Sequence, residues 1–309
     1  MLCDNILSAI GGTPLIRLNK MTERSDAEIY VKFEGLGAGG SIKTRTALRM
    51  IEAAERKKLL GRGSVIVEPT SGNQGIGLAL VGAVKGYRVV IVMPDSVSEE
   101  RRKLIRHYGA EVILVHDEGD IGECIRACIE RAEEFKREHP NAFLPQQFEN
   151  QENVLAHRQT TAQEIMKDLS HIDGFCSGIG TGGTITGVGQ ALKEKFPELV
   201  VWAAEPENAA ILARGESGAH LQMGIGDGII PPILDQSVYD KICLVSDAEA
   251  IKTARLLAGK EGIACGISSG TNVAVALRLA KTLGAGKRVV TLLPDTAERY
   301  FSTPLFDGE

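Results

Sequence analysis

Short apolar runs alternate with segments of helical periodicity along almost the whole chain of 309 residues. Continuous apolar runs such as Val89–Val92 and Val112–Val115 are typical of parallel strands that helices cover on both faces. A helical pattern, for example at residues 121–137, separates each run from the next. Because this alternation builds βαβ units, the sequence predicts an α/β protein with two doubly wound domains and largely parallel sheets.

A polar stretch from Pro140 to Asn153, rich in Asn, Gln and Glu, separates two series of strands and helices. We therefore expect an N-terminal α/β domain at residues 1–145 and a C-terminal α/β domain at residues 146–309. About the first 35 residues of the N-terminal part are expected to pack on the other domain.

The composition excludes several kinds of partner. The chain is 43% hydrophobic, 24% charged and 5% aromatic, with a formal net charge of -5. A mildly negative chain does not suit nucleic acid or an anionic membrane surface, and few aromatic rings are present to stack on single strands. Neither an export leader nor an apolar run of about 18 residues is visible, so we expect a cytoplasmic protein.

Cysteine spacing gives no metal motif. Cys124 and Cys128 lie four residues apart in a helical pattern, which would suit a metal, but no second ligand pair accompanies them. The interpretation is that the six cysteines are buried free thiols and that the protein holds no metal.

The segment Gly39–Lys43 joins a strand expected at residues 28–33 to a helix expected at residues 41–59. The glycines allow a tight turn close to a ligand, and Ser41 is placed to cap the helix. Lys43 lies in the first helical turn, where the positive helix end disfavours its charge and favours a nucleophilic neutral amine. A solvated surface lysine is the alternative.

Three further turns lead from a strand into a helix. The glycine-rich turn after Cys176 is typical of a phosphate site, although a tight turn without ligand remains the alternative. The turn after Pro69 is rich in donors and would hold a carboxylate, with an elaborate helix cap as the alternative. Ser268 opens a third helix, as an ordinary cap would also do. The candidate residues of the first two turns are Gly180, Thr181, Gly182, Gly183, Thr184, and Thr70, Ser71, Asn73, Gln74.

These parts together match the needs of pyridoxal 5'-phosphate. That cofactor requires an amine for its aldehyde, an anion site for its phosphate and a partner for its pyridine nitrogen. Its substrate is an amino acid, whose carboxylate needs a site as well.

On these motifs the chain resembles, nearly end to end, the cysteine synthase family of β-replacing pyridoxal-phosphate enzymes of fold type II. The resemblance implies that Lys43 carries the cofactor, that Asn73 reaches its ring hydroxyl and that Ser268 faces its ring nitrogen. It implies a phosphate site at Gly180–Thr184 and a homodimer. Substrate binding is implied for Thr70, Ser71, Gln74 and Gln147.

The implied chemistry begins when Lys43 takes the α-proton of the amino acid and the β-substituent leaves. The resulting aminoacrylate then accepts a nucleophile. Two positions depart from the family pattern beside the expected site, where Gln74 replaces threonine and Asp227 replaces a small residue. Asp227 would act as a base that activates water and would disfavour the hydrosulfide anion. A turn carboxylate that points to solvent or to a basic neighbour is its alternative.

Several activities stay open within this class. The first is synthesis of cysteine from an activated serine such as O-acetylserine and sulfide. The second is breakdown of cysteine with release of sulfide, with water forming serine. A different nucleophile, such as an amine, is a third, and a pyridoxal-phosphate-binding regulator without turnover is a fourth.

Overall fold

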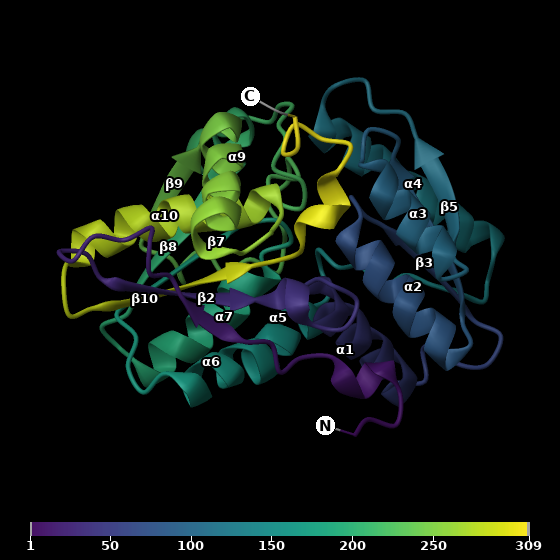
Figure 1. The fold of residues 1–309 in the computed structure, drawn as a ribbon. Coiled ribbons are helices and arrows are strands. Elements are labelled where there is room, and N and C mark those ends of the chain that lie inside the picture. Colours follow the sequence, from purple (N-terminus) through teal and green to yellow (C-terminus); the bar gives the residue numbers. More distant parts are fainter. Residues whose placement is uncertain (1, 308–309) are drawn as a thin grey trace.

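Two sheets with helices on both faces make up residues 2–307, the part of the chain that the computed structural model describes (Figure 1). The larger sheet has the strand order β1-β2-β10-β7-β8-β9, and the smaller has the order β5-β4-β3-β6. All paired strands are parallel except β1 and β2. The predicted α/β class with largely parallel sheets is therefore confirmed.

The elements have the following bounds. The larger sheet contains β1 (Leu15–Arg17), β2 (Glu28–Phe33), β7 (Gly174–Gly178), β8 (Val200–Pro206), β9 (Lys241–Val245) and β10 (Arg288–Leu293). The smaller sheet contains β3 (Val65–Pro69), β4 (Arg88–Pro94), β5 (Glu111–Val115) and β6 (Ala142–Phe143). The α-helices are α1 (Lys43–Arg56), α2 (Asn73–Lys85), α3 (Glu99–His107), α4 (Ile121–Glu138), α5 (Gln151–Ala156), α6 (Ala162–Asp168), α7 (Gly183–Lys195), α8 (Ile211–Arg214), α9 (Asp247–Leu256) and α10 (Ile267–Leu283). Shorter helical segments are η1 (Ile6–Ala9), η2 (Glu34–Leu36), η3 (His157–Thr161), η4 (Glu207–Ala209), η5 (Leu257–Glu261) and η6 (Ala297–Tyr300).

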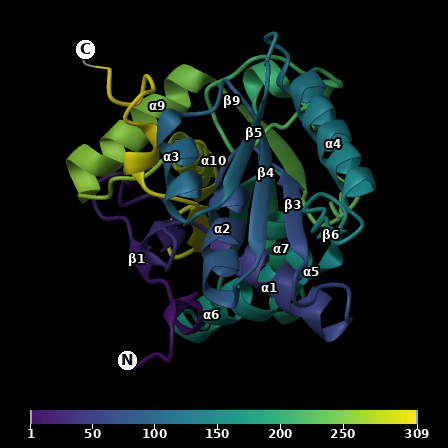
Figure 2. The ribbon, with the colours of Figure 1, turned by 90° about the vertical axis from the view of Figure 1, so that its right-hand side faces the viewer.

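The smaller sheet is buried on both faces. Successive side chains of β3 point to opposite sides, so Val65 and Val67 pack with α4 whereas Ile66 packs with α1 and α2. Figure 2 shows α4 on one side of this sheet and α1, α2 and α3 on the other. Because both faces are covered, the strand reads as a continuous apolar run in the sequence.

The larger sheet follows the same rule. Cys176 and Val289 pack with α9 and α10, whereas their neighbours Phe175 and Val290 pack with α6 and α7. The carboxyl ends of β7 and β10 therefore open toward the smaller sheet's helices, and turns that leave these strands can meet turns that leave β3.

The N-terminal strands do not join the smaller sheet. β2 pairs with β10, and β1 pairs with β2, at one edge of the larger sheet. The last strand of the smaller sheet is β6, which pairs with β3. The division of the chain at residue 145 remains a prediction.

Two helix starts bear on the site. The helical region after the polar stretch begins at Gln151 and passes through a π-helical segment at His157–Thr161. α10 is helical from Ile267, so Ser268 lies inside its first turn. The six cysteines are free thiols, and five of them are buried as predicted, whereas Cys3 is only half-buried. Among the helices of residues 2–307, none has the length and apolarity needed to span a bilayer.

Candidate active site

A cavity lies where turns from both sheets meet, and Lys43 is on its wall. The space between its walls, open solvent at the mouth included, is about 750 Å³. Of the residues predicted for the site, all but Gly183 line it. They are Lys43, Thr70, Ser71, Asn73, Gln74, Gln147, Gly180, Thr181, Gly182, Thr184, Asp227 and Ser268.

Lys43 is the first residue of α1 and follows two glycines with positive φ, 78° at Gly39 and 67° at Gly40. The turn is tied to the larger sheet, because the Ile42 N–H donates to the Pro294 carbonyl at 2.8 Å. The expectation that Ser41 caps α1 is wrong. The N-cap is Ile42, which has no capping side chain, and the Ser41 carbonyl instead accepts from Thr44 Oγ1 at 2.9 Å.

The amine of Lys43 sits in a setting that disfavours its charge. Burial lowers its pKa, and the negative charge of Asp227 opposes this change only in part. Its Nζ is 3.5 Å from Thr181 Oγ1. A lysine with a lowered pKa is neutral for a larger fraction of the time, which is what a nucleophile or base requires.

The turn between β3 and α2, residues 70–73, presents backbone N–H groups at a helix start. Gly72 has φ of 143° and precedes α2 without a side-chain cap. The Asn73 side chain is held at both ends: its Nδ2 donates to Asp295 Oδ2 at 2.6 Å, and its Oδ1 accepts from Arg299 Nε at 3.1 Å. This turn is therefore fixed to the C-terminal segment of the chain.

Gln74 is directed toward α1. Its Oε1 accepts from Thr46 Oγ1 at 2.7 Å, its Nε2 lies 3.7 Å from Met50 Sδ, and only 1% of the residue is exposed. The side chain thus links two helices under the cavity. Its contact with a substrate remains a prediction.

Gln147 is positioned by a buried carboxylate that sequence reasoning missed. The N–H groups of Gln146 and Gln147 donate to the two oxygens of Glu68 at 2.9 and 2.8 Å. Burial raises the pKa of Glu68 to about 8, although these two bonds favour its charged form. The Gln147 side chain then donates to the Pro69 carbonyl at 3.0 Å. In the sequence, the sign of this buried carboxylate is Glu68 itself, a charged residue within the apolar run of β3.

Two neutral side chains contact the threonines of the turn between β7 and α7, residues 180–184. Asn153 Nδ2 donates to Thr181 Oγ1 at 2.9 Å. His157 Nε2 lies 3.2 Å from Thr184 Oγ1, and burial lowers the pKa of this histidine well below its ordinary value. Gly182 has φ of 80°, which favours glycine.

Asp227 lies on the other side of the cavity. The residue is 8% exposed, and none of the hydrogen bonds found within residues 2–307 involves its carboxylate. A Cβ added to Gly180 would lie 3.4 Å from Asp227 Oδ2, so the carboxylate is beside the β7–α7 turn. Burial raises its pKa, while Lys43, then His220 and Arg101, act in the opposite direction. The solvent-facing alternative for Asp227 is therefore not supported.

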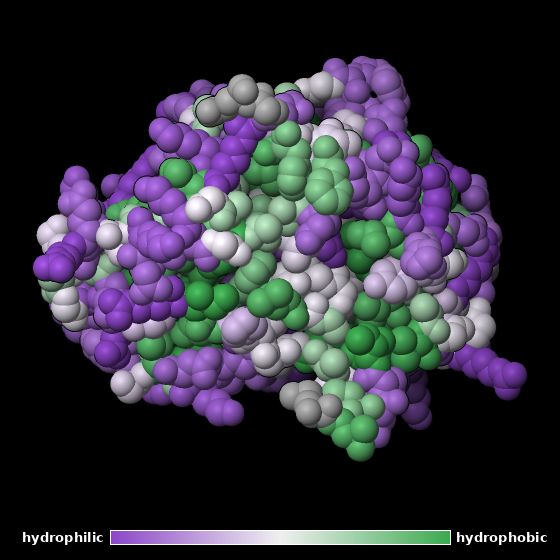
Figure 3. Space-filling model, viewed as in Figure 1, coloured by the Kyte–Doolittle hydropathy of each residue, from purple (hydrophilic) through white to green (hydrophobic). Residues whose placement is uncertain are grey.

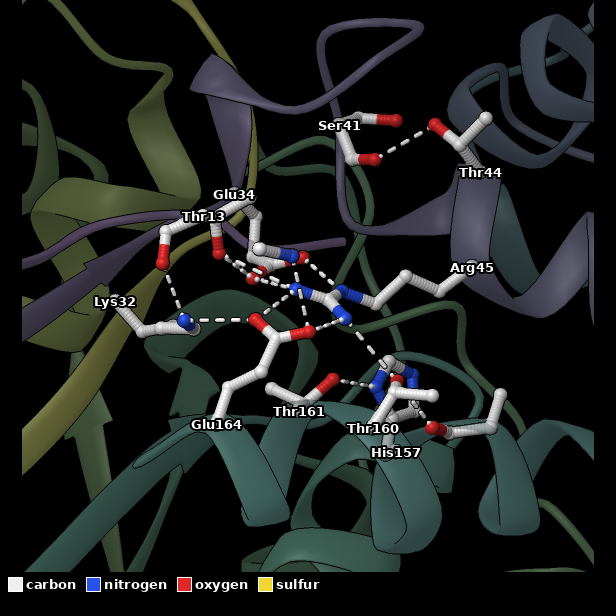
Figure 4. Close-up of polar contacts among 12 residues, drawn as sticks. Thr13, Lys32, Glu34, Ser41, Thr44, Arg45, His157, Thr160, Thr161 and Glu164 are labelled. Atoms are coloured by element: carbon white, nitrogen blue, oxygen red, sulfur yellow. Dashed lines mark hydrogen bonds and ion pairs between the residues drawn. The ribbon is translucent and has the colours of Figure 1, made fainter. Parts of the chain in front are cut away.

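A buried ion-pair network fixes the start of α1 (Figure 4). Arg45 forms bonds of 2.6 Å with both Glu34 and Glu164, and Lys32 lies 2.8 Å from Glu164. Burial disfavours charge here, but the bonds from Arg45 and Lys32 hold the pKa of Glu164 at about 2. Two cations and two carboxylates balance, so the network anchors Lys43's helix to β2 and α6 without net charge. In the sequence, the only sign of this network is Arg45, a charged residue on an apolar helix face.

The donor set fits pyridoxal phosphate. The N-terminus of α7 has no side-chain cap and opens into the cavity, as a phosphate site requires. Lys43 supplies an amine in the same cavity, and Ser268 lines the cavity with its hydroxyl group. An amine, an anion cradle and a neutral hydroxyl are the three parts that the cofactor needs.

Comparisons with known proteins agree with this geometry. The family model described as "Pyridoxal-phosphate dependent enzyme" matches residues 6–295. A cysteine synthase of Staphylococcus aureus is 47% identical over 305 residues, 98% of this chain and 97% of that protein. The solved structure of a lysine-to-alanine mutant of O-ureido-L-serine synthase, bound to O-ureido-L-serine, is 45% identical with a TM-score of 0.95, covering 100% of this chain and 95% of that one. A hydrogen sulfide-producing enzyme from Fusobacterium nucleatum is 43% identical with a TM-score of 0.92, covering 97% and 100%.

The chain therefore belongs to the pyridoxal-phosphate-dependent enzyme family. Its relationship to cysteine synthases confirms the resemblance that its motifs indicated, together with the fold class and the cofactor. The roles of individual residues are proposed below.

Proposed function

We propose that the chain consumes L-cysteine by β-replacement, with water as nucleophile, and releases sulfide and L-serine. The observation that carries this proposal is Asp227, a carboxylate that is 8% exposed, has no hydrogen-bond partner among the described residues and lines the cavity that contains Lys43. A buried carboxylate without a partner is costly unless it serves a ligand or a reaction.

The wider reaction class does not depend on Asp227. The protein is a pyridoxal-phosphate-dependent enzyme of β-replacement and β-elimination on serine- or cysteine-type amino acids, as its family and relatives indicate. In this proposal, Asp227 determines which nucleophile replaces the β-substituent.

The remaining roles follow from position. When bound, pyridoxal phosphate supplies a ring that withdraws electrons from the α-carbon of the amino acid. In this proposal the residues of the β7–α7 turn hold its phosphate, Ser268 faces its ring nitrogen and Asn73 its ring hydroxyl. Thr70, Ser71 and Gln147 bind the substrate carboxylate. Lys43 Nζ, with its lowered pKa, attaches the cofactor and takes the α-proton.

The proton transfers balance. Lys43 Nζ takes the α-proton, the Cβ–S bond breaks and sulfide leaves with the bonding electrons. Asp227 then takes a proton from water as the new Cβ–O bond forms, Lys43 returns a proton to the α-carbon, and the proton on Asp227 passes to the departed hydrosulfide. L-Cysteine and water thus give L-serine and hydrogen sulfide. Burial makes Asp227 a stronger base than an exposed aspartate because it raises the pKa.

Cysteine synthesis is the second candidate, and the 47% identity to a cysteine synthase favours it. The same residues would then act on an activated serine, with sulfide in place of water. An amine-type nucleophile is a further candidate within the class. A regulator without turnover is less well supported, because Lys43 has the lowered pKa of a reactive amine.

The test follows sulfide and serine production from L-cysteine by the holoenzyme and its Asp227→Asn variant. We expect serine formation to fall by roughly 10²- to 10⁴-fold, the usual worth of a general base. Release of the first sulfide per site should persist, because that step depends on Lys43.

Two further variants serve as controls. Asp117→Asn removes a carboxylate from the vestibule next to the cavity and should leave serine formation within about 2-fold of wild type, since a base must be within reach of its proton. Lys43→Ala should abolish both products. Equal serine output from wild type and Asp227→Asn, or none from wild type, would reject the water-adding role and leave cysteine synthesis as the better candidate.

We also propose, from the family resemblance, that the protein is a cytoplasmic homodimer. Figure 3 shows hydrophobic residues gathering over the middle of one face, and exposed apolar side chains there would favour association. A monomer mass in light scattering would contradict the dimer, and recovery in a membrane or secreted fraction would contradict the location.

A further inference from the structure

Arg101 is a buried cation that has no role in the reaction described above. It comes from α3 and is only 1% exposed. A Cβ added to Gly72 would lie 2.3 Å from Arg101 Cδ and 3.0 Å from its Nε. The stem of the Arg101 side chain therefore packs directly against Gly72 of the β3–α2 turn, and Arg101 itself does not line the cavity.

The guanidinium is only partly paired. One terminal nitrogen donates to Tyr300 Oη at 2.8 Å and lies 3.7 Å from Asp295 Oδ2, and the other contacts Met223 Sδ. Its Nε is buried and has no hydrogen-bond partner within residues 2–307. A buried N–H that faces the turn without a partner is unusual, because such groups normally find an acceptor.

The charges behind this turn do not balance. Arg299 is also buried and donates to Asn73 Oδ1 and to the Gly40 carbonyl, at 3.1 and 2.9 Å. Asp295 is the carboxylate that both the Asn73 amide and the Tyr300 hydroxyl contact. Two guanidinium groups and one carboxylate leave a net charge of +1 beneath the turn. Lys43 and Asp227 line the adjoining cavity, and the charge of Arg101 also acts on Asp227. Because Lys43 and Asp227 carry opposite charges when both are ionised, including them leaves the sum at +1.

An excess buried cation is costly unless an anion compensates it. The open face of the β3–α2 turn is the place for that anion, because the N–H groups at the start of α2 already point there. We propose that Arg101 is a positioning residue that makes this turn select ligands with an α-carboxylate, through its field and without touching the ligand. This inference rests on the proposed amino-acid substrate but not on the role of Asp227.

The test measures binding without turnover. L-Alanine has no β-leaving group, and L-alaninamide differs from it only by a neutral amide in place of the carboxylate. Both are titrated into the holoenzyme while the absorbance of the cofactor is followed, for wild type, Arg101→Met and Arg101→Lys. The matched control is Arg106→Met, which removes the same charge from an exposed position of α3.

We expect Arg101→Met to weaken binding of L-alanine by about 10- to 100-fold, as the loss of a nearby buried charge implies, and to leave L-alaninamide within about 2-fold. Arg101→Lys should restore most of the preference, and Arg106→Met should keep it. An equal loss for both ligands would show a structural role only, and an unchanged preference would show no role; either result overturns the proposal. If Arg101→Met does not fold, Arg101→Gln takes its place with the same expected loss of the preference for L-alanine. Absence of any preference in wild type would instead remove the proposed substrate class.

Discussion

The β3–α2 turn and the β7–α7 turn occupy the same position in their two sheets, yet the groups behind them differ. Both follow a buried parallel strand, and both start a helix that has no side-chain cap. Ionisable side chains lie behind the first turn, where Glu68 and Arg101 are buried. Neutral groups lie behind the second, where Asn153 and His157 contact its threonines.

From this difference we infer that the two turns bind an anion in different ways. In the first, buried charges set the field, so selectivity depends on side chains that never reach the ligand. In the second, neutral side chains only orient the threonines, and binding depends on backbone N–H groups and the helix end. The first turn should therefore be sensitive to changes behind it and the second to changes in its own backbone.

The largest expected effect comes from Gly182→Asp. The substitution places a carboxylate in the proposed phosphate cradle, and its Cβ would lie 2.9 Å from that of Leu234 at a φ of 80°. Retention of pyridoxal phosphate after dialysis should fall by at least about 100-fold, because like charges repel at close range. Gly215→Asp is the matched control, since that glycine also has positive φ, 73°, but has open space around it. Full retention by Gly182→Asp would mean that the phosphate binds elsewhere.

A smaller effect concerns Glu68 and pH. Its folded-state pKa of about 8 lies above the ordinary 4.5, so the folded state holds the proton more tightly. Stability from this group is complete below about pH 4.5 and is lost as pH rises toward 8. The side chain introduced by Glu68→Gln cannot ionise. As pH rises over this range, the variant should therefore lose less of its free energy of unfolding than wild type, and the difference between the two losses should be roughly 2–4 kcal/mol. Denaturant titrations at pH 5 and 8 measure this, and parallel pH curves for the two proteins would contradict it.

The contribution of His157 to stability should change with pH in the opposite direction to that of Glu68, and by a smaller amount. Burial, and then the charges of Lys43 and Arg45, keep its pKa well below 6.5 in the folded state. Its contribution to stability is present above about pH 6.5 and is lost as pH falls below that value, because the unfolded chain gains the proton. His157→Gln should reduce the acid loss by about 1–2 kcal/mol between pH 7 and 5. A variant as acid-sensitive as wild type would mean that His157 is not the group that titrates.

Sequence patterns predicted the strands, the turns and Lys43, because apolar runs and glycines act locally. They did not predict what lies behind the turns. Glu68 reads as one more residue of a buried strand, and Arg101 reads as part of a polar helix surface. Their burial follows from contacts with residues about 80 and 200 positions away along the chain.

Gln74 and Ser41 illustrate the same limit. Both occupy positions where a ligand contact or a cap was plausible, and in the fold Gln74 bonds α1 while the Ser41 hydroxyl has no partner. The identity of a residue indicates which bonds it is able to form, but the packing of α1 against α2 decides which of them exist. Side-chain direction at a helix start is therefore less predictable than the start itself.

The buried cysteines have a consequence for an enzyme that handles thiols. Only a thiolate attacks disulfides or becomes oxidised readily, and burial raises the pKa of Cys176 and of Cys265 to about 12. The thiols of Cys124, Cys128 and Cys243 are shifted in the same direction by burial. In the reaction proposed above, which involves cysteine and sulfide, the five buried thiols are thereby kept from forming mixed disulfides, and Cys3, near the chain start, is the one of the six cysteines that is not buried.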